Sequence, residues 1–214
     1  MARRSLLSRI GIVPALLALL PFVAGSPLTA QASSADLLWS VPVVNEHAIN
    51  NVACGQAAAT MVLDYYLNDS GGSSVGIGTV ARYVPFTYRA GSPTGTNPMN
   101  LASGLEGASR ALGVPLDAVW EHTQSSNWRG TLRHELADGH PVIAYLSDGG
   151  MLWGGSWHYG HYIVVSGLHP DGSVIYHDPF DGRQHTVSAD TFGRVWGNGT
   201  RRTWTYLHIT PREA

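Results

Sequence analysis

The segment Gly55–Leu67 constrains the fold of this 214-residue chain more than any other feature. It has the pattern of a helix that is apolar almost all round, with Asp64 as its only charge. A helix that is apolar on every side has to be buried in the middle of a core. The turn-forming stretch Asn68–Ser73 then ends it. We therefore predict a central buried helix against which the rest of the chain packs.

The pattern beyond this helix places further helices first and strands later. Helices are predicted at Asn100–Leu112, with Asn97 or Asn100 as N-cap, and at Ser126–Asp138, and a glycine follows each. The remaining predicted elements are strands at Leu37–Val44, Pro141–Leu146, Tyr162–Ser166, Ser173–His177 and Thr203–Ile209, and a short helix at Ala189–Val195. This order predicts an α+β fold.

Two of the strands are expected to pair with each other. The turn Pro170–Gly172 separates Tyr162–Ser166 from Ser173–His177, which predicts an antiparallel hairpin. By contrast, Ser74–Asn97 is rich in Gly, Pro and Thr and shows no period. We expect a long functional or mobile loop there, and whether it acts as a lid stays open.

Residues 1–32 have the pattern of a secretory signal peptide. Three arginines lie within Arg3–Arg9, Ile10–Ala24 is an apolar h-region, and Ala30–Ala32 is a small-x-small cleavage site. We expect cleavage there, which leaves residues 33–214 as a single extracytoplasmic domain that is free of the membrane. The alternative is a membrane anchor, but the apolar region is short and broken by proline. General and twin-arginine export both stay open.

The composition excludes several classes of partner and architecture. The net charge is −2 and 44% of the residues are hydrophobic. The chain therefore lacks both the basic excess of a nucleic-acid-binding protein and the composition of a disordered one. We see no internal repeat, and we expect a monomer whose partner is a peptide or protein substrate.

Cys54 is the only cysteine of the chain. Exported proteins normally pair their cysteines or avoid them, so a lone thiol is inert and buried, an intermolecular pairing point, or reactive. Position favours reactivity, because Cys54 directly precedes the buried helix. The free N–H groups and the dipole of a helix N-terminus stabilise a thiolate and can receive an oxyanion. A structural cysteine would more naturally lie within the helix, for example at Val62.

A thiol nucleophile needs a base, and the base needs an orienting group. The chain has ten histidines, so position is more informative than presence. His161 directly precedes Tyr162–Ser166, and Asp178 directly follows the second strand of the hairpin. These ends adjoin in an antiparallel pair, so Asp178 should lie beside His161 and orient its imidazole. His177 should face away from Asp178 and is predicted to be structural.

Four motifs in the right order carry a resemblance to a known family. Cys54–Tyr66 resembles the "CGPAA…MVL.YY" signature of the bacteriocin-processing-type peptidases, family C thirty-nine, a bacterial branch of the papain-like cysteine peptidases. Gly139–Ala144 is similar to their "G.PVI" strand, and Gly160–Gly167 to their "GHYVVV.G" strand. Asp171–Gly172 and His177–Pro179 resemble their "DG…DP" ending. The likeness is closest to stand-alone secreted members.

The resemblance implies a papain-like fold, in which an N-terminal catalytic helix packs on an antiparallel sheet. It also implies roles for three residues: Cys54 as nucleophile, His161 as general base and then acid, and Asp178 as the orienting acid. No cofactor is expected.

The chain departs from the family pattern at two places. Gln56 stands where proline is usual, and Glu46 stands where the family has the glutamine of the oxyanion hole. A carboxylate cannot donate a hydrogen bond unless it is protonated. Asn45, Asn50 or Asn51 could supply an amide instead, or the hole could rely on backbone N–H groups.

Further residues are candidates for substrate binding. Gly55 and Gly160 would let a substrate backbone approach closely, and Trp157 and Tyr159 could line a groove, although ordinary packing explains aromatic residues equally well. His158, together with His161 and Asp178, could form a metal site. We do not expect one, because no other cluster points to the same place.

These observations predict a secreted cysteine peptidase that works through a Cys–His–Asp triad and an acyl-enzyme thioester. One alternative is a cysteine amidase or transpeptidase acting on cell-wall peptides. Another is a degenerate peptidase-like domain that only binds peptide. A Glu46 that points away, with an asparagine reaching the hole, would favour the enzyme, whereas a Glu46 that fills the hole would favour the binding domain.

Overall fold

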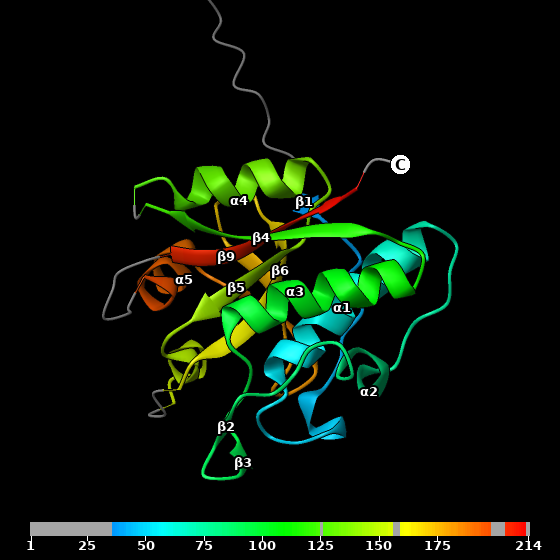
Figure 1. Cartoon of the computed structure of the whole chain (residues 1–214). Coiled ribbons are helices and arrows are strands. Elements are labelled where there is room, and N and C mark those ends of the chain that lie inside the picture. Colours follow the sequence, from blue (N-terminus) through cyan, green and yellow to red (C-terminus); the bar gives the residue numbers. More distant parts are fainter. Residues whose placement is uncertain (1–35, 125, 156–158, 198–203, 213–214) are drawn as a thin grey trace, which may run out of the picture. The chain divides into compact units, whose positions relative to one another are not determined.

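The centre of the fold is an antiparallel sheet with the strand order β4-β9-β5-β6-β7-β8, to which β1 adds by pairing with β6 (Figure 1). The computed structural model describes residues 36–124, 126–155, 159–197 and 204–212. The strands of this sheet are β1 (Leu37–Leu38), β4 (Leu116–Thr123), β5 (Val142–Leu146), β6 (His161–Leu168), β7 (Val174–Asp178), β8 (Arg183–Val187) and β9 (Trp204–Pro211). The helices are η1 (Glu46–Ala48), α1 (Cys54–Asp69), α2 (Ile77–Val80), α3 (Pro98–Ala111), α4 (Trp128–Ala137), η2 (Gly149–Trp153) and α5 (Ala189–Trp196).

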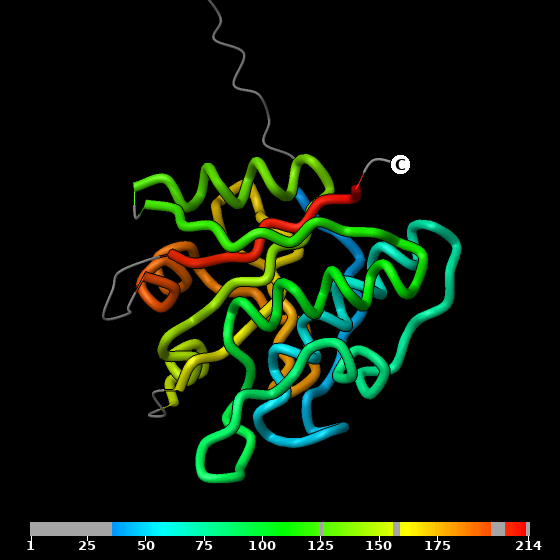
Figure 2. Tube along the Cα trace, in the orientation of Figure 1, coloured from blue at the N-terminus to red at the C-terminus, as the bar shows by residue number. Residues whose placement is uncertain are grey.

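Helices cover both faces of this sheet (Figures 1 and 2). Along β6, Tyr162 and Val164 belong to the core that contains α1 and α3, whereas Ile163 and Val165 belong to the core that contains α4 and α5. Successive side chains of a strand point to opposite faces. All eight residues of β6 are buried, because each face has a helical layer over it.

Helix α1 is buried as its composition predicts, with thirteen of its sixteen residues inside the core. It packs on β6, and the Tyr66 hydroxyl donates a hydrogen bond to the backbone oxygen of Ile209 on β9. The one charged residue of its middle, Asp64, accepts the backbone N–H of Val75 at 2.6 Å. Burial raises the pKa of Asp64, and this hydrogen bond acts against the rise. The helix that carries Cys54 is thus held from all sides.

The predicted hairpin is present as β6 and β7, in antiparallel register with Val164 opposite His177. Gly172, at the turn, has a φ of +84°, a conformation that favours glycine. His161 begins the first strand and Asp178 ends the second. The hairpin therefore carries these two side chains to the same end of the sheet.

Helices α1, α3, α4 and α5 and the central strands agree with the sequence prediction, and the two sheet edges do not. β4 and β8 are absent from the prediction, and they are the two ends of the strand order. Within the described residues each pairs on one side only, and each carries many exposed or half-buried residues, so its hydrophobic pattern is weak. The strand predicted at Leu37–Val44 shortens to two residues.

The segment predicted as a loop at Ser74–Asn97 contains local structure. It holds α2 and a small hairpin of β2 (Tyr88–Arg89) and β3 (Ser92–Pro93), and it links α1 to α3 (Figure 2). Asn97 then caps α3 by accepting the backbone N–H of Asn100 at 2.8 Å.

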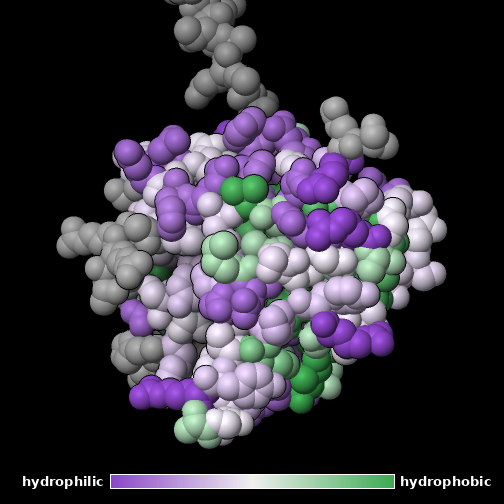
Figure 3. Space-filling model, in the orientation of Figure 1, coloured by the Kyte–Doolittle hydropathy of each residue, from purple (hydrophilic) through white to green (hydrophobic). Residues whose placement is uncertain are grey.

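The face drawn in Figure 3 carries mostly hydrophilic and intermediate residues, with apolar residues in small groups. Within the described residues, none of the helices has the length and apolar character needed to cross a bilayer. The predicted signal segment, residues 1–32, lies outside the described residues.

Candidate active site

Cys54 is the first residue of α1, and its side chain lines a pocket. Ala53 stands at the N-cap and provides no capping side chain. The first N–H groups of a helix have no partner within the helix. The positive end of the α1 dipole is therefore directed at the thiol, which favours negative charge there.

His161 and Asp178 form a buried pair at the end of the β6–β7 hairpin. The Nε2 of His161 lies 2.8 Å from Oδ1 of Asp178, and their side chains are 4% and 0% exposed. The backbone N–H of Phe180 donates to the same Oδ1 at 2.9 Å. Asp178 is therefore fixed by its own turn and in turn fixes the orientation of the imidazole.

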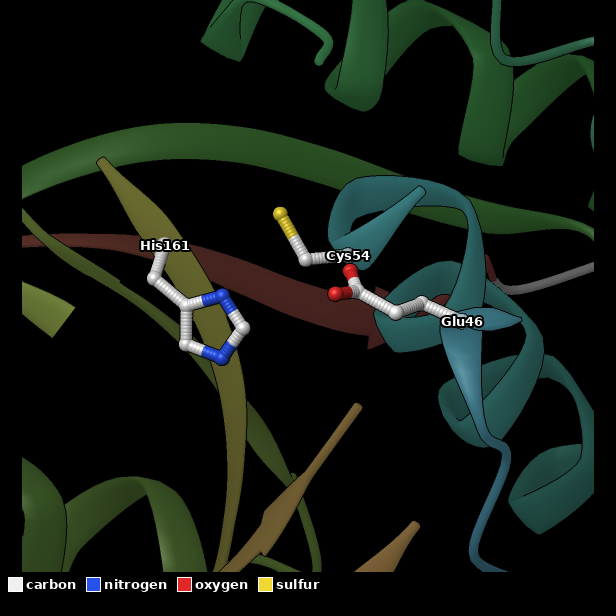
Figure 4. A group of neighbouring side chains, drawn as sticks. All are labelled: Glu46, Cys54 and His161. Carbon is white, nitrogen blue, oxygen red and sulfur yellow. The ribbon is translucent and has the colours of Figure 1, made fainter. Parts of the chain in front are cut away.

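The Nδ1 side of His161 faces Cys54, since Nε2 is engaged by Asp178 (Figure 4). Burial by itself lowers the pKa of His161. Hydrogen bonds to Asp178 and Cys54 and the charges of both groups outweigh this effect and raise the pKa to about 10. An imidazolium next to a thiolate is the arrangement of an activated cysteine nucleophile.

Glu46 is the third side chain beside the thiol. The sulfur of Cys54, a ring nitrogen of His161 and a carboxyl oxygen of Glu46 all lie within 4.8 Å of one another (Figure 4). Glu46 is 2% exposed, and its Oε2 has no hydrogen-bond partner among the described residues. Burial raises the pKa of Glu46, His161 and His47 act against this rise, and Asp178 adds to it.

The backbone of Glu46 ties it to the other side of the site. Its N–H donates to the carbonyl of Pro179, the residue after Asp178, at 2.9 Å. Its own carbonyl accepts the N–H groups of Ile49 and Asn50, which closes the turn of η1. The chain before α1 is thereby anchored to the end of β7, and the Glu46 side chain is held beside Cys54.

A cavity of about 450 Å³ opens onto these groups. Four parts of the chain form its walls: the stretch from η1 to α1, the end of the β2–β3 hairpin, the start of β6, and the turn after β7. The lining residues are Glu46, Asn51, Val52, Cys54, Pro93, Thr94, Gly95, Tyr159, Gly160, His161 and Phe180. Part of the Ser74–Asn97 segment is thus a wall of the pocket.

The asparagines proposed for the oxyanion hole differ in position. Asn51 lines the pocket. Asn45 instead caps η1 by accepting the N–H of His47 at 2.8 Å, and Asn50 accepts the N–H of Val52 at 2.9 Å. Neither Asn45 nor Asn50 lines the pocket, and the role of either in the oxyanion hole stays a prediction.

Two glycines proposed for substrate binding have packing roles. A Cβ on Gly55 would lie 2.2 Å from a methyl group of Thr96, and Gly55 does not line the pocket. Close packing against Thr96 therefore accounts for a glycine at this position. Gly160 does line the pocket, but its Cβ would also meet the Tyr145 hydroxyl at 2.3 Å.

Of the aromatic residues proposed for substrate binding, the structure places one at the pocket. Tyr159 lines the pocket and is 74% exposed, so it is available to a substrate. Trp157 and His158 lie outside the described residues. Trp153 packs edge-on against His161, with ring centroids 5.8 Å apart, and also contacts Phe180.

Other residues that shape the site escaped the sequence prediction. Gly149 lies behind the imidazole, where a Cβ would meet that of His161 at 2.4 Å. Phe180 and the stretch Pro93–Gly95 line the pocket. In the sequence, the motif His177–Pro179 indicated only the neighbourhood of Phe180, and no pattern marked Gly149.

Glu46, Cys54 and His161 are also close enough to hold a metal ion such as zinc. We do not assign them as metal ligands, because nucleophilic chemistry requires the same proximity of thiol and imidazole. The metal set considered from the sequence would have used Asp178, which binds the other ring nitrogen of His161.

The fold is similar to that of a solved structure. A fragment of prointerpain A from Prevotella intermedia superposes with a TM-score of 0.53 at 15% identity, over 85% of this chain and 74% of that one. UfSP from C. elegans gives a TM-score of 0.44 at 10% identity, over 87% of this chain and 36% of that one. The predicted papain-like α+β fold is confirmed.

The sequence comparisons then identify the family. The chain belongs to the Peptidase_C39 like family, whose model matches residues 38–203. A 50-residue stretch is 34% identical to Cysteine protease effector 1 of Escherichia coli O1:K1:H7. That stretch is 23% of this chain and only 10% of the length of the effector.

Proposed function

We propose that the protein is a cysteine peptidase that hydrolyses peptide bonds, with Cys54 as nucleophile, His161 as general base and acid, and Asp178 as the orienting group. One observation carries this proposal. His161 bonds to Asp178 through one ring nitrogen and faces Cys54 with the other, at the floor of an open pocket. The family and the fold support it.

The proposed reaction is acyl transfer in two halves. The Cys54 thiolate attacks the amide carbonyl, a C–S bond forms, and the carbonyl electron pair moves to oxygen. The tetrahedral intermediate collapses as the C–N bond breaks, and the His161 proton goes to the departing amine. Water then attacks the thioester and gives a proton to His161, and the C–S bond breaks to release the acid.

The remaining parts of the proposal concern the cellular location, the oligomeric state and the substrate of the protein. We propose that residues 1–32 direct export and are removed, so that the domain acts outside the cytoplasm as a monomer. The likeness to Cysteine protease effector 1 supports a peptide or protein substrate. The exposed Tyr159 at the pocket supports an aromatic contact with that substrate.

The first test is the rate at which a small alkylating reagent modifies Cys54 as a function of pH. An unactivated thiol reacts slowly at about pH 6, because free cysteine titrates near about 8.5. We expect fast reaction at that pH in the wild type and loss of it in His161→Ala. The variant His134→Ala is a matched control, since His134 is exposed and belongs to α4. A slow thiol, or one indifferent to His161, would contradict the proposal.

The position of Glu46 favours a second candidate function. A carboxylate beside Cys54 would repel a developing oxyanion, as expected of a degenerate domain that binds peptide without cleaving it. Such a domain would bind peptides in the pocket, and Cys54→Ala would leave both binding and the absence of turnover unchanged. Peptide binding by calorimetry, together with turnover of a fluorogenic peptide library, separates the two candidates.

A cysteine amidase or transpeptidase would use the same three residues with a different acceptor. Mass spectrometry of products from cell-wall peptides, with and without an added amine, distinguishes these reactions. A peptidase releases the free acid, whereas a transpeptidase joins the acyl group to the amine.

A further inference from the structure

The carboxyl group of Glu46 is buried although one of its oxygens has no hydrogen-bond partner among the described residues. It is 2% exposed, its Oε2 has no hydrogen-bond partner among the described residues, and it lies beside the thiol and the imidazole. A buried polar atom without a partner costs free energy, so such an atom calls for an explanation. In Figure 4 the carboxyl group points toward Cys54 and His161 rather than away from the site.

Burial favours the neutral form of Glu46, whereas the neighbouring charges act in both directions: His161 and His47 lower its pKa and Asp178 raises it. The titratable groups that face it are Cys54 of α1, His161 of β6, His47 of η1 and Asp178 of β7. In the active ion pair, the single positive charge of His161 already faces the Cys54 thiolate and Asp178. A third anion at this buried position would leave an excess of negative charge, and burial raises the pKa of Glu46 in the same direction.

We propose that Glu46 works as a protonated carboxylic acid, donating a hydrogen bond to the oxyanion that forms beside Cys54, so that the enzyme is active in acid and loses activity as Glu46 ionises. This inference rests on the proposed peptidase function. A neutral carboxyl has one O–H donor, whereas the ionised form only accepts. Buried carboxyl groups can remain neutral near neutral pH and donate in this way.

The role is that of a hydrogen-bond donor, so no proton leaves Glu46 during the reaction. When the thiolate attacks and the carbonyl electron pair moves to oxygen, the O–H of Glu46 stabilises that charge. Above the pKa of Glu46, the same group is an anion that repels the intermediate. The alkaline limb of the activity profile is then set by Glu46 rather than by His161, whose pKa is raised to about 10.

The decisive variant is Glu46→Gln, because an amide of the same shape donates a hydrogen bond at every pH. The probes are p-nitrophenyl acetate and a fluorogenic peptide, both of which pass through an oxyanion. We expect similar kcat/KM in wild type and variant at about pH 5, and at least tenfold higher kcat/KM for Glu46→Gln at about pH 8. Glu135→Gln is the matched control, since Glu135 is also buried but pairs with His208 away from the pocket, and its profile should follow the wild type.

Alkylation of Cys54 in the same proteins distinguishes a failure of the peptidase proposal from a failure of the proposed Glu46 role, because alkylation forms no oxyanion. A wild type whose thiol alkylates slowly at about pH 6 overturns the peptidase proposal. If alkylation is fast, the peptidase proposal stands and the activity profiles test the role of Glu46. That role is contradicted if Glu46→Gln loses activity over the same alkaline range as the wild type or is inactive throughout. It is also contradicted if the wild type shows no turnover at about pH 5.

Discussion

Asp178 and Glu46 are two buried carboxyl groups that approach the same imidazole from different elements. Asp178 is held by the His161 ring and by the backbone of Phe180, through hydrogen bonds of 2.8 and 2.9 Å. Glu46 is anchored through its backbone, and among the described residues neither its Oε2 nor the Oδ2 of Asp178 has a hydrogen-bond partner. The comparison teaches that burial does not assign the role of a carboxyl group. Its hydrogen-bond partners distinguish a carboxyl group that orients the imidazole from one that is available to a substrate.

The largest effect is expected when Asp178 loses its charge. In Asp178→Asn the shape is kept, but the neutral amide cannot stabilise the imidazolium and can favour the wrong tautomer. We expect kcat to fall on the order of 10⁴-fold, with a lower pKa for His161 in an NMR titration. A variant that keeps wild-type kcat and His161 titration would show that the two carboxyl groups do not differ in this way.

His177 shows what burial does to a histidine that has no acid partner among the described residues. It lies on β7, bonds to the Ser166 hydroxyl at 2.8 Å, and is predicted correctly to face away from Asp178. Burial, and to a lesser degree His185, lowers the pKa of His177 to about 4.

Because the folded pKa of His177 is depressed, its contribution to stability is present above the unfolded value near 6.5 and is lost as pH falls towards about 4. Over that window the free energy of unfolding should fall by up to about 3 kcal/mol more in the wild type than in His177→Gln. Urea unfolding at several pH values measures the difference. Parallel curves for the two proteins would contradict it.

Removal of the Glu46 carboxyl group tests the second of the two buried carboxyl groups. Glu46→Ala leaves the oxyanion without this donor, and we expect kcat in acid to fall on the order of a hundredfold. Alkylation of Cys54 should stay fast, because it needs no such donor. Equal losses in kcat and in alkylation would instead indicate that Glu46 acts on the thiol–imidazole pair.

The smallest effect is expected in stability and needs no substrate. Glu46 has a raised folded pKa, so the folded state binds more protons than the unfolded state, and stability is lost as pH rises through this window. Glu46→Gln removes this loss. The variant should match the wild type at low pH and become the more stable protein as pH rises, as measured by urea unfolding. A constant difference across pH would show that Glu46 titrates normally.

Local patterns were sufficient to predict most of the fold and the central part of the site. The all-round apolar character of Gly55–Leu67 predicted the buried helix α1, and the turn before Ser173 predicted the β6–β7 hairpin. The hairpin in turn placed His161 beside Asp178. The edge strands β4 and β8 were missed, because a half-exposed strand lacks a strong hydrophobic pattern.

The sequence by itself determined which chemical groups are present and which ends of helix and strand carry them, because periodicity and turn residues are local properties. Only the tertiary structure decided what lies around those groups. It directs Glu46 to Cys54, removes Asn45 and Asn50 from the pocket, and packs Thr96 over Gly55. These outcomes depend on contacts between segments far apart in the chain. A residue's charge and hydrogen bonding follow from such neighbours, which no local pattern contains.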